Sequence, residues 1–146
     1  MRAWLMAALA GLSFSALADT VDIDAATLER LRAEGVPVVD IRTAPEWQQT
    51  GIVPGSHLLT FFDASGEAEP EAWLARLQAI AKAGQPVVLI CRSGNRSAKV
   101  SRFLTENAGY ARVYNVGGGI RDWLKDAHPV VQPAQAASTC ARASTC

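Results

Sequence analysis

The sequence predicts an α/β domain of three layers, in which a central parallel sheet is flanked by helices. Short apolar segments of strand length alternate with segments of helical spacing through most of the chain, and this alternation is typical of parallel sheets. One of the apolar segments, residues 36–41, is almost continuously apolar, as expected for a strand that is buried on both faces. The length of 146 residues leaves no room for two domains of ordinary size.

Residues 1–18 have the pattern of a secretory signal peptide. Arg2 supplies the positive charge, residues 4–14 form the apolar region, and residues 16–18 read Ala-Leu-Ala, a small-x-small cleavage site. The apolar region is shorter than the ~20 residues that span a bilayer, which disfavours an uncleaved anchor. We therefore expect a mature chain that begins at Asp19, is periplasmic or secreted, and has no membrane contact after cleavage.

The first half of the mature chain contains three predicted strands. Leu28 and Leu31 stand at helical spacing and Gly35 ends that helix. The expected order is strand 19–23, helix 25–34, strand 36–41, a short helix at 45–49, and strand 57–62 after a glycine- and proline-containing loop.

The second half continues the alternation. Pro70 is well placed to open a helix over 71–83, which has one apolar face. The expected order is then the strand that ends before Cys91, a helix over 97–107 ended by Gly109, strand 112–116, and a final helix around Trp123 and Leu124. The three glycines at 117–119 lack the spacing of a dinucleotide fingerprint and indicate a turn.

Cys91 is the predicted reactive residue, because it ends an apolar strand and opens a short polar loop. Ligands bind at the carboxyl ends of strands in parallel sheets. The loop reads Cys91, Arg92, Ser93, Gly94, Asn95, Arg96, Ser97. Its glycine and asparagine permit a curled backbone whose N–H groups point inward. Together with the two arginines and the start of a helix, such a loop lowers a cysteine pKa from about 8.5 to roughly 3.5–7.5. The alternative, an inert buried cysteine, is disfavoured by the arginines and the glycine turn.

Four segments of the chain resemble the rhodanese homology domain, the single-domain sulfurtransferase family. They are Val38-Val39-Asp40-Ile41-Arg42 with Glu46-Trp47, Gly51-Ile52-Val53-Pro54-Gly55-Ser56, the Cys91–Ser97 loop, and Gly117-Gly118 with Trp123. One departure is Ile52, where the family often has histidine. The resemblance covers nearly all of the mature chain, and it implies a rhodanese-like fold for residues 19–131.

The resemblance also implies a sulfur relay. Cys91 would take the outer sulfur of a small anionic donor such as thiosulfate, form a persulfide, and pass the sulfur to cyanide or a thiol. The loop residues 92–97 would bind the substrate: its amides would hold the sulfur, Arg92 would steer the anion, and Ser97 would donate a hydrogen bond. No metal or organic cofactor is implied. In an oxidising compartment, a reductant that keeps Cys91 reduced becomes an expected partner.

Two other functions remain open at this stage. A non-enzymatic persulfide carrier would need the same loop. A cysteine-based phosphatase or arsenate reductase places its arginine after five intervening residues, whereas Arg96 follows Cys91 after four. The shorter loop favours a sulfur atom over a phosphate. Acidic and basic residues are equal in number, 14 each, which gives no indication of a nucleic-acid partner.

Several other residues have structural interpretations. Asp40 and Arg42 interrupt an apolar strand and are expected to support the site. Arg96 either binds substrate or pairs with a buried Asp40, since buried acids are seldom unpaired. Trp47 and Trp123 are expected to pack in the core. His57 and His128 each lack a second ligand at metal spacing, so neither is a candidate metal ligand.

Residues 132–146 form a tail that is rich in Ala, Ser and Thr. Low apolar content predicts disorder or a loose arm. Cys140 and Cys146 are spaced to close a small disulfide loop, which an oxidising compartment permits and which leaves Cys91 as the odd thiol. The alternative is that a tail thiol exchanges with Cys91, although a disordered arm has a low effective concentration at any one site.

Overall fold

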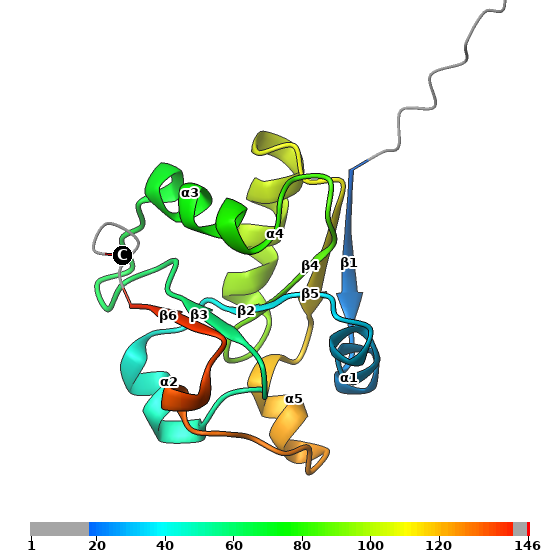
Figure 1. Cartoon of the computed structure of the whole chain (residues 1–146), viewed down its shortest axis with the longest axis vertical. Coiled ribbons are helices and arrows are strands. Elements are labelled where there is room, and N and C mark those ends of the chain that lie inside the picture. Colours follow the sequence, from blue (N-terminus) through cyan, green and yellow to red (C-terminus); the bar gives the residue numbers. More distant parts are fainter. Residues whose placement is uncertain (1–17, 142–145) are drawn as a thin grey trace, which may run out of the picture.

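The computed structural model describes residues 18–141 and 146. In this part of the chain six strands form one sheet, and every neighbouring pair of strands is parallel. The strand order is β1-β5-β4-β2-β3-β6 (Figure 1). The strands are β1 Asp19–Ile23, β2 Val38–Asp40, β3 His57–Leu59, β4 Val87–Ile90, β5 Arg112–Val116 and β6 Ser138–Cys140. The predicted α/β fold with a central parallel sheet is confirmed.

Helices cover both faces of the sheet (Figure 1). They are α1 Ala25–Ala33, α2 Ala44–Thr50, α3 Pro70–Ile80, α4 Asn95–Asn107 and α5 Gly119–Lys125, with a 3₁₀ turn at Pro133–Gln135. The apolar side chains of α3 and α4 pack on one face, with Val39 and Leu89. Those of α1 and α5 pack on the other, with Val38 and Val88. Because both faces are covered, β2 and β4 are buried throughout, which is why β4 is a continuous apolar run and β2 is apolar except for Asp40.

The predicted elements differ from the observed ones mainly at their ends. The last predicted strand, 112–116, agrees with β5, whereas strand 57–62 is observed only as His57–Leu59. Helix α4 begins at Asn95 rather than at residue 97. Gly94 takes the left-handed conformation immediately before it, so the helix starts as soon as the turn is complete.

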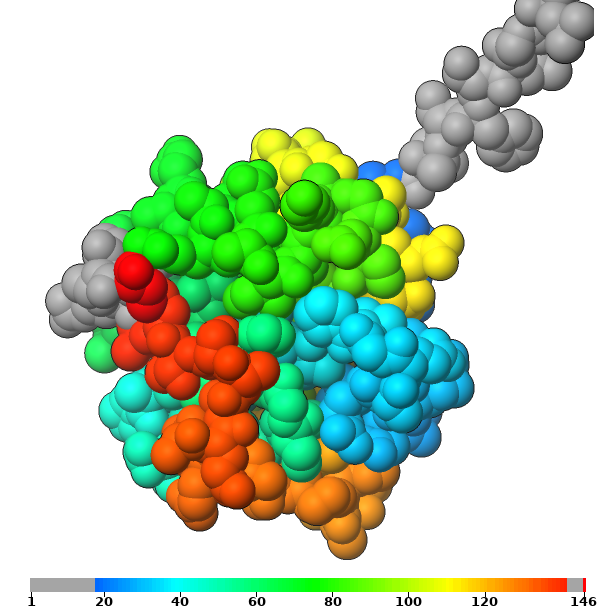
Figure 2. Space-filling model, in the orientation of Figure 1, coloured from blue at the N-terminus to red at the C-terminus, as the bar shows by residue number. Residues whose placement is uncertain are grey.

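The prediction of a loose tail is wrong for residues 132–141. Ile52 and Val131 exchange backbone hydrogen bonds at 3.0 Å each, and β6 then pairs in parallel with β3. Figure 2 shows this segment, in orange and red, lying against the body of the domain. The edge of β3 has backbone groups that need partners, and β6 supplies them. Within β6 only Cys140 is buried, so the composition of the tail does not reveal the strand.

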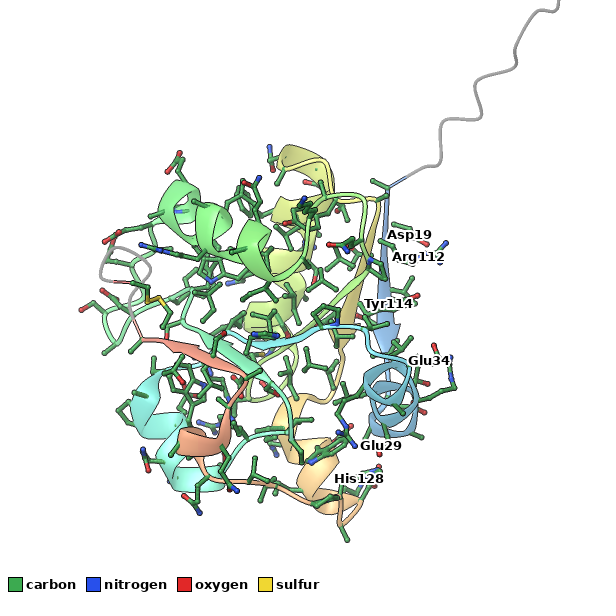
Figure 3. All side chains as sticks on the ribbon, viewed as in Figure 1. Asp19, Glu29, Glu34, Arg112, Tyr114 and His128 are labelled. Carbon is green, nitrogen blue, oxygen red and sulfur yellow. A yellow bond between two sulfur atoms is a disulfide. The ribbon has the colours of Figure 1, made fainter. Side chains whose placement is uncertain are left out.

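The opposite edge of the sheet is β1, which pairs only with β5 among the described strands. Polar side chains line this side of the molecule, among them Asp19 of β1 and Arg112 of β5 (Figure 3). On the neighbouring α1, Glu29 and Glu34 form ion pairs with arginines of the same helix. Charged groups on an edge strand discourage pairing with another chain.

The predicted signal peptide, residues 1–18, lies outside the described residues except for Ala18, which is exposed. Among the helices of the described part, none combines the length and the apolar character that a membrane crossing requires.

Candidate active site

Cys91 lies at the carboxyl end of β4, near the middle of the sheet, and its side chain is almost fully buried. The backbone on either side of it is tied to the start of α5. The Ile120 N–H donates to the Cys91 carbonyl at 2.9 Å, and the Arg121 N–H donates to the Arg92 carbonyl at 3.3 Å. The strand and the last helix therefore fix the position from which the loop begins.

Three donors of the loop point at the sulfur of Cys91. The Gly94 N–H lies 3.2 Å from Sγ, the Ser97 N–H lies 3.5 Å away, and the Ser97 hydroxyl lies 3.2 Å away. Burial of the sulfur disfavours a charge, but hydrogen bonds from the Ser97 side chain and from the Ser97, Ser93 and Gly94 amides outweigh it, so the pKa of Cys91 is lowered. The loop therefore stabilises a thiolate.

The loop can close around the sulfur because glycines stand where it crosses the last strand–helix turn. Gly94 has φ of 89°, and a Cβ there would collide with the backbone of Gly117. A Cβ on Gly119 would lie 2.5 Å from the Arg92 carbonyl oxygen. Gly119 thus does more than the predicted turn requires: together with Gly94 it allows the loop and the turn to pack backbone against backbone.

The two arginines of the loop have different surroundings. Arg92 is exposed, and no hydrogen bond or ion pair holds its side chain within the described residues. Arg96 forms two hydrogen bonds to the carboxylate of Glu46, at 3.0 and 2.5 Å. The predicted alternative in which Arg96 pairs with Asp40 is wrong, because Asp40 has another partner. Ser93 contributes a backbone amide to the site, and Asn95 is the exposed first residue of α4.

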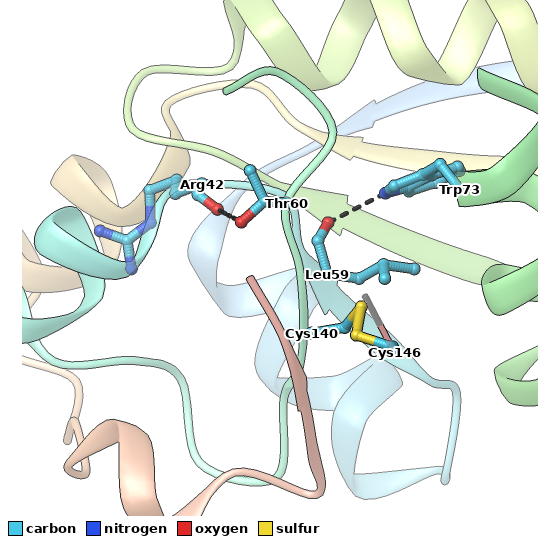
Figure 4. Close-up of a disulfide and its surroundings, with 6 residues drawn as sticks. All are labelled: Arg42, Leu59, Thr60, Trp73, Cys140 and Cys146. Atoms are coloured by element: carbon cyan, nitrogen blue, oxygen red, sulfur yellow. Dashed lines mark hydrogen bonds between the residues drawn. A yellow bond between two sulfur atoms is a disulfide. The ribbon is translucent and has the colours of Figure 1, made fainter. Parts of the chain in front are cut away.

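Asp40 pairs with Arg42, and both side chains are buried, at 0% and 1% exposed. The Arg42 guanidinium also donates to the Thr50 hydroxyl at 2.8 Å and to the Gly51 carbonyl at 3.1 Å. Figure 4 shows the Arg42 carbonyl accepting a hydrogen bond from the Thr60 hydroxyl, at 2.7 Å. This network joins the end of β2 to the C-terminal end of α2 and to the residue that follows β3, and so it holds the helix that carries Glu46.

Three residues of this region have no role in the sequence-based account. Glu46 was part of the family-like segment, and the Thr43–Glu46 capping box that orients it is readable from the sequence. Asn115 lies in β5 and is 2% exposed. Its amide oxygen accepts from the Ser97 hydroxyl at 2.6 Å, and its NH₂ donates to Asp22 at 2.7 Å. The sequence signal for Asn115 is a polar residue inside a buried strand, because buried polar groups require partners.

The tail cysteines form a disulfide with each other, Cys140 to Cys146 (Figure 4). Cys140 is paired in register with Leu59 of β3, and β2 and β3 separate it from the strand that precedes Cys91. The distance is three strand spacings, on the order of 14 Å. Cys91 is the free cysteine, and direct exchange with the tail would require that β6 leave its position.

Trp47 and Trp123 are buried and pack in the core beneath α2 and α5. His57 bonds to the Ser138 hydroxyl through Nδ1 at 2.8 Å, and His128 stacks on Trp123. Within residues 18–141 and 146 no group of three His, Cys, Asp or Glu side chains is arranged to hold a metal ion.

The site and the fold together define a class of protein: an α/β domain with one free cysteine, whose sulfur accepts hydrogen bonds from a loop at the carboxyl end of a central strand. Comparison with known proteins is more specific. The profile described as "Rhodanese-like domain" matches residues 24–126, and the chain belongs to this family, as its sequence motifs predicted.

Named relatives agree with this assignment. A protein of Allochromatium vinosum named "Sulfurtransferase" is 34% identical over 119 residues, which are 77% of this chain and 95% of the relative. The "Thiosulfate sulfurtransferase GlpE" of Pseudoalteromonas translucida is 33% identical over 68% of this chain and 83% of its own length. The crystal structure of Rv0390 from M. tuberculosis superimposes with a TM-score of 0.62 at 24% identity, over 79% of this chain and 98% of that one. This last similarity establishes the fold.

Proposed function

We propose that this protein is a sulfurtransferase that moves a sulfane sulfur from a small anionic donor, such as thiosulfate, to a thiophilic acceptor through a persulfide on Cys91. The observation that carries the proposal is the convergence of three loop donors on Sγ, two amides and one hydroxyl. Such an arrangement favours the anionic sulfur that must attack the donor. Relatives named sulfurtransferase support the class of reaction.

In the first step the Cys91 thiolate attacks the outer sulfur of thiosulfate. The bond between the two sulfur atoms of thiosulfate breaks, its electron pair leaves with sulfite, and a new bond joins Sγ to the transferred sulfur. The persulfide carries one negative charge on its outer sulfur, so the total charge is unchanged. The exposed Arg92 guanidinium attracts the dianionic donor toward the loop.

In the second step the outer sulfur of the persulfide is attacked by an acceptor. With cyanide, a carbon–sulfur bond forms, the bond to Sγ breaks with its electron pair on Cys91, and thiocyanate leaves. With a thiolate acceptor, the acceptor becomes the new persulfide by the same exchange. The thiolate of Cys91 is regenerated in either case, and the buried loop donors that stabilise it make it a good leaving group.

The ion pair of Arg96 disfavours the phosphatase alternative. A phosphate-binding loop needs a free cation to surround a tetrahedral oxyanion. Here Glu46 occupies both terminal nitrogens of Arg96. Glu46 thus compensates the charge of Arg96, whereas Arg92, at the rim of the loop, has no ion pair among the described residues.

The decisive experiment is to incubate the protein that begins at Asp19 with thiosulfate and to measure its intact mass. We expect one added sulfur on the wild type and none on Cys91→Ser. Cyanide is then added, and thiocyanate is measured. Sulfur addition followed by multiple turnovers supports the enzyme; sulfur addition without turnover identifies a persulfide carrier. An unmodified mass for the wild type, together with release of phosphate from an aryl phosphate, would replace the proposal by the phosphatase alternative.

The proposal includes a site of action outside the cytoplasm. The predicted signal peptide over residues 1–18 supports it, and so does the Cys140–Cys146 disulfide, a bond that is favoured in oxidising compartments. In such a compartment Cys91 is subject to oxidation. A thiol reductant or a steady supply of the sulfur donor is then the partner that keeps Cys91 active. Expression of the whole chain followed by fractionation tests this part.

A further inference from the structure

The hydroxyl group of Ser97 has one hydrogen but three acceptors within reach. Its oxygen lies 3.2 Å from Cys91 Sγ, 3.3 Å from the Gly94 carbonyl oxygen and 2.6 Å from Asn115 Oδ1. A hydroxyl donates to one acceptor at a time with good geometry. The shortest of the three contacts is to Asn115, so the sulfur and the amide oxygen compete for the same hydrogen.

Asp22 determines which end of the Asn115 side chain faces Ser97. The Asn115 NH₂ group donates to Asp22 Oδ1 at 2.7 Å. An ionised carboxylate only accepts hydrogen bonds, so the NH₂ group must face Asp22 and the amide oxygen must face Ser97. Asn115 is buried between β1 and α4, at 2% exposed. Turning the amide around would place two oxygens against each other and leave both without a donor.

The geometry points to Asn115, held by Asp22, as a positioning residue that takes the Ser97 hydrogen whenever Cys91 Sγ is uncharged and releases it when Sγ becomes a thiolate. In the thiol state, the S–H group donates to Ser97 Oγ and the Ser97 hydrogen donates to Asn115. In the thiolate state, the Ser97 hydrogen turns to the sulfur, and Asn115 Oδ1 loses its donor. Only the O–H bond rotates.

The role of Asn115 in the reaction follows from the persulfide state, and this step rests on the proposed function. When sulfur is loaded, the negative charge moves from Sγ to the outer sulfur. Sγ is then a poor acceptor, and the Ser97 hydrogen returns to Asn115. Asn115 therefore stabilises both uncharged states of Sγ relative to the thiolate. It makes the thiolate a stronger nucleophile and favours the loaded form of the protein.

The test is the pKa of Cys91, measured from the ultraviolet absorbance of the thiolate as the difference from Cys91→Ser. The charged groups near the loop, Arg92, the Arg96–Glu46 pair and the Asp40–Arg42 pair, are unchanged in the Asn115→Leu and Ser97→Ala variants. With Asn115→Leu, the Ser97 hydrogen has no competing amide, and we expect the pKa of Cys91 to fall by about one, a roughly tenfold change in the thiol equilibrium. In a Ser97→Ala background the same substitution should leave the pKa unchanged.

Asp22→Asn tests the second link and changes a side chain on the exposed edge strand β1. An asparagine at position 22 can donate, so the Asn115 amide can turn around and donate to Ser97 Oγ, which directs the Ser97 hydrogen to the sulfur. The pKa of Cys91 should fall. Asp19→Asn removes the same charge from the same strand without a contact to Asn115, and it should have a much smaller effect.

The outcomes separate this inference from the proposed function. Equal pKa values in wild type and Asn115→Leu, or the same fall in the presence and absence of the Ser97 hydroxyl, would overturn it. If Asn115→Leu does not fold, Asp22→Asn takes its place. The pKa of Cys91 should then fall in Asp22→Asn and stay unchanged when Asp22→Asn is combined with Ser97→Ala. If the variants show the expected pKa changes but the wild type takes up no sulfur from thiosulfate, the sulfur relay is refuted and the hydrogen-bond competition is supported. If both hold, Asn115→Leu should also need several-fold more thiosulfate, at fixed sulfite, to reach half loading.

Discussion

Arg96, the last arginine of the Cys91 loop, is bonded through both terminal nitrogens to the carboxylate of Glu46, at 3.0 and 2.5 Å. Glu46 belongs to α2, fifty positions earlier in the chain. The pair therefore joins the loop to the helix that follows β2, and a residue that the sequence offers as a substrate ligand is engaged in holding the loop in place.

This ion pair predicts a specific acid sensitivity. The neighbouring Arg96 and the Thr43 hydrogen bonds outweigh the effect of burial and lower the pKa of Glu46 from 4.5 to about 2. A lowered folded-state pKa contributes stability above about pH 4.5 that is lost as the pH falls toward about 2. The free energy of unfolding of Glu46→Gln should be lower than that of wild type by on the order of 1–3 kcal/mol at neutral pH.

The measurement is urea denaturation of both proteins across that pH range. The difference between them should shrink as the pH is lowered. Glu106→Gln removes an exposed carboxylate from α4 and controls for the loss of one charge. A difference between wild type and Glu46→Gln that stays constant down to about pH 2 would contradict the assignment.

A second prediction concerns the buried pair Asp40–Arg42. Both side chains are almost wholly inaccessible to solvent, so Asp40→Asn leaves a buried guanidinium without its counter-ion. Breaking such a pair costs about 3–5 kcal/mol. The matched control is Glu34→Gln, which breaks the exposed Arg30–Glu34 pair on α1 and should cost less than about 1 kcal/mol. Equal losses for the two variants, measured by denaturant unfolding, would show that burial does not matter here.

Gly94 offers a third test, because the chain contains a matched glycine. Gly94 and Gly35 have similar positive φ, 89° and 84°, but a Cβ on Gly35 meets no atom within 4 Å, whereas one on Gly94 collides with Gly117. Gly35→Ala should cost about 1–2 kcal/mol from backbone strain alone. Gly94→Ala should cost more and raise the pKa of Cys91, because the loop amides are displaced. Sulfur loading at the wild-type rate in Gly94→Ala would refute this.

The fourth prediction addresses the tail. In Cys140→Ser/Cys146→Ser the short disulfide loop is lost, and the free energy of unfolding should fall by about 2 kcal/mol or less. Sulfur loading of Cys91 should be unchanged, because β2 and β3 lie between the disulfide and the loop. Intact mass after thiosulfate treatment measures the loading, with Cys91→Ser as the blank. Loss of loading in the double variant would revive sulfur exchange between the tail and Cys91.

Local sequence signals were sufficient for most of the fold. The alternation of β-type and helical apolar patterns predicted the parallel α/β architecture, because a strand buried on both faces must be apolar throughout, as Val87–Ile90 is. The strand of the tail was not predicted. Ser138–Cys140 owes its place to backbone hydrogen bonds with β3, and almost any sequence without proline can supply those.

By itself, the sequence determined the family, the position of Cys91 at the end of a strand, and the loop whose amides surround the sulfur. The family is recorded in four short motifs along the chain, and the strand end and the loop in consecutive residues, so short-range patterns record all three. Only the tertiary structure decided the partners of the charged and polar side chains: Arg96 with Glu46, Asp40 with Arg42, and Asn115 with Ser97 and Asp22. Most of these contacts join residues far apart in sequence, and several candidates of suitable chemistry existed for each. The choice among them was made by the register of the strands and the packing of the helices, which no local pattern specifies.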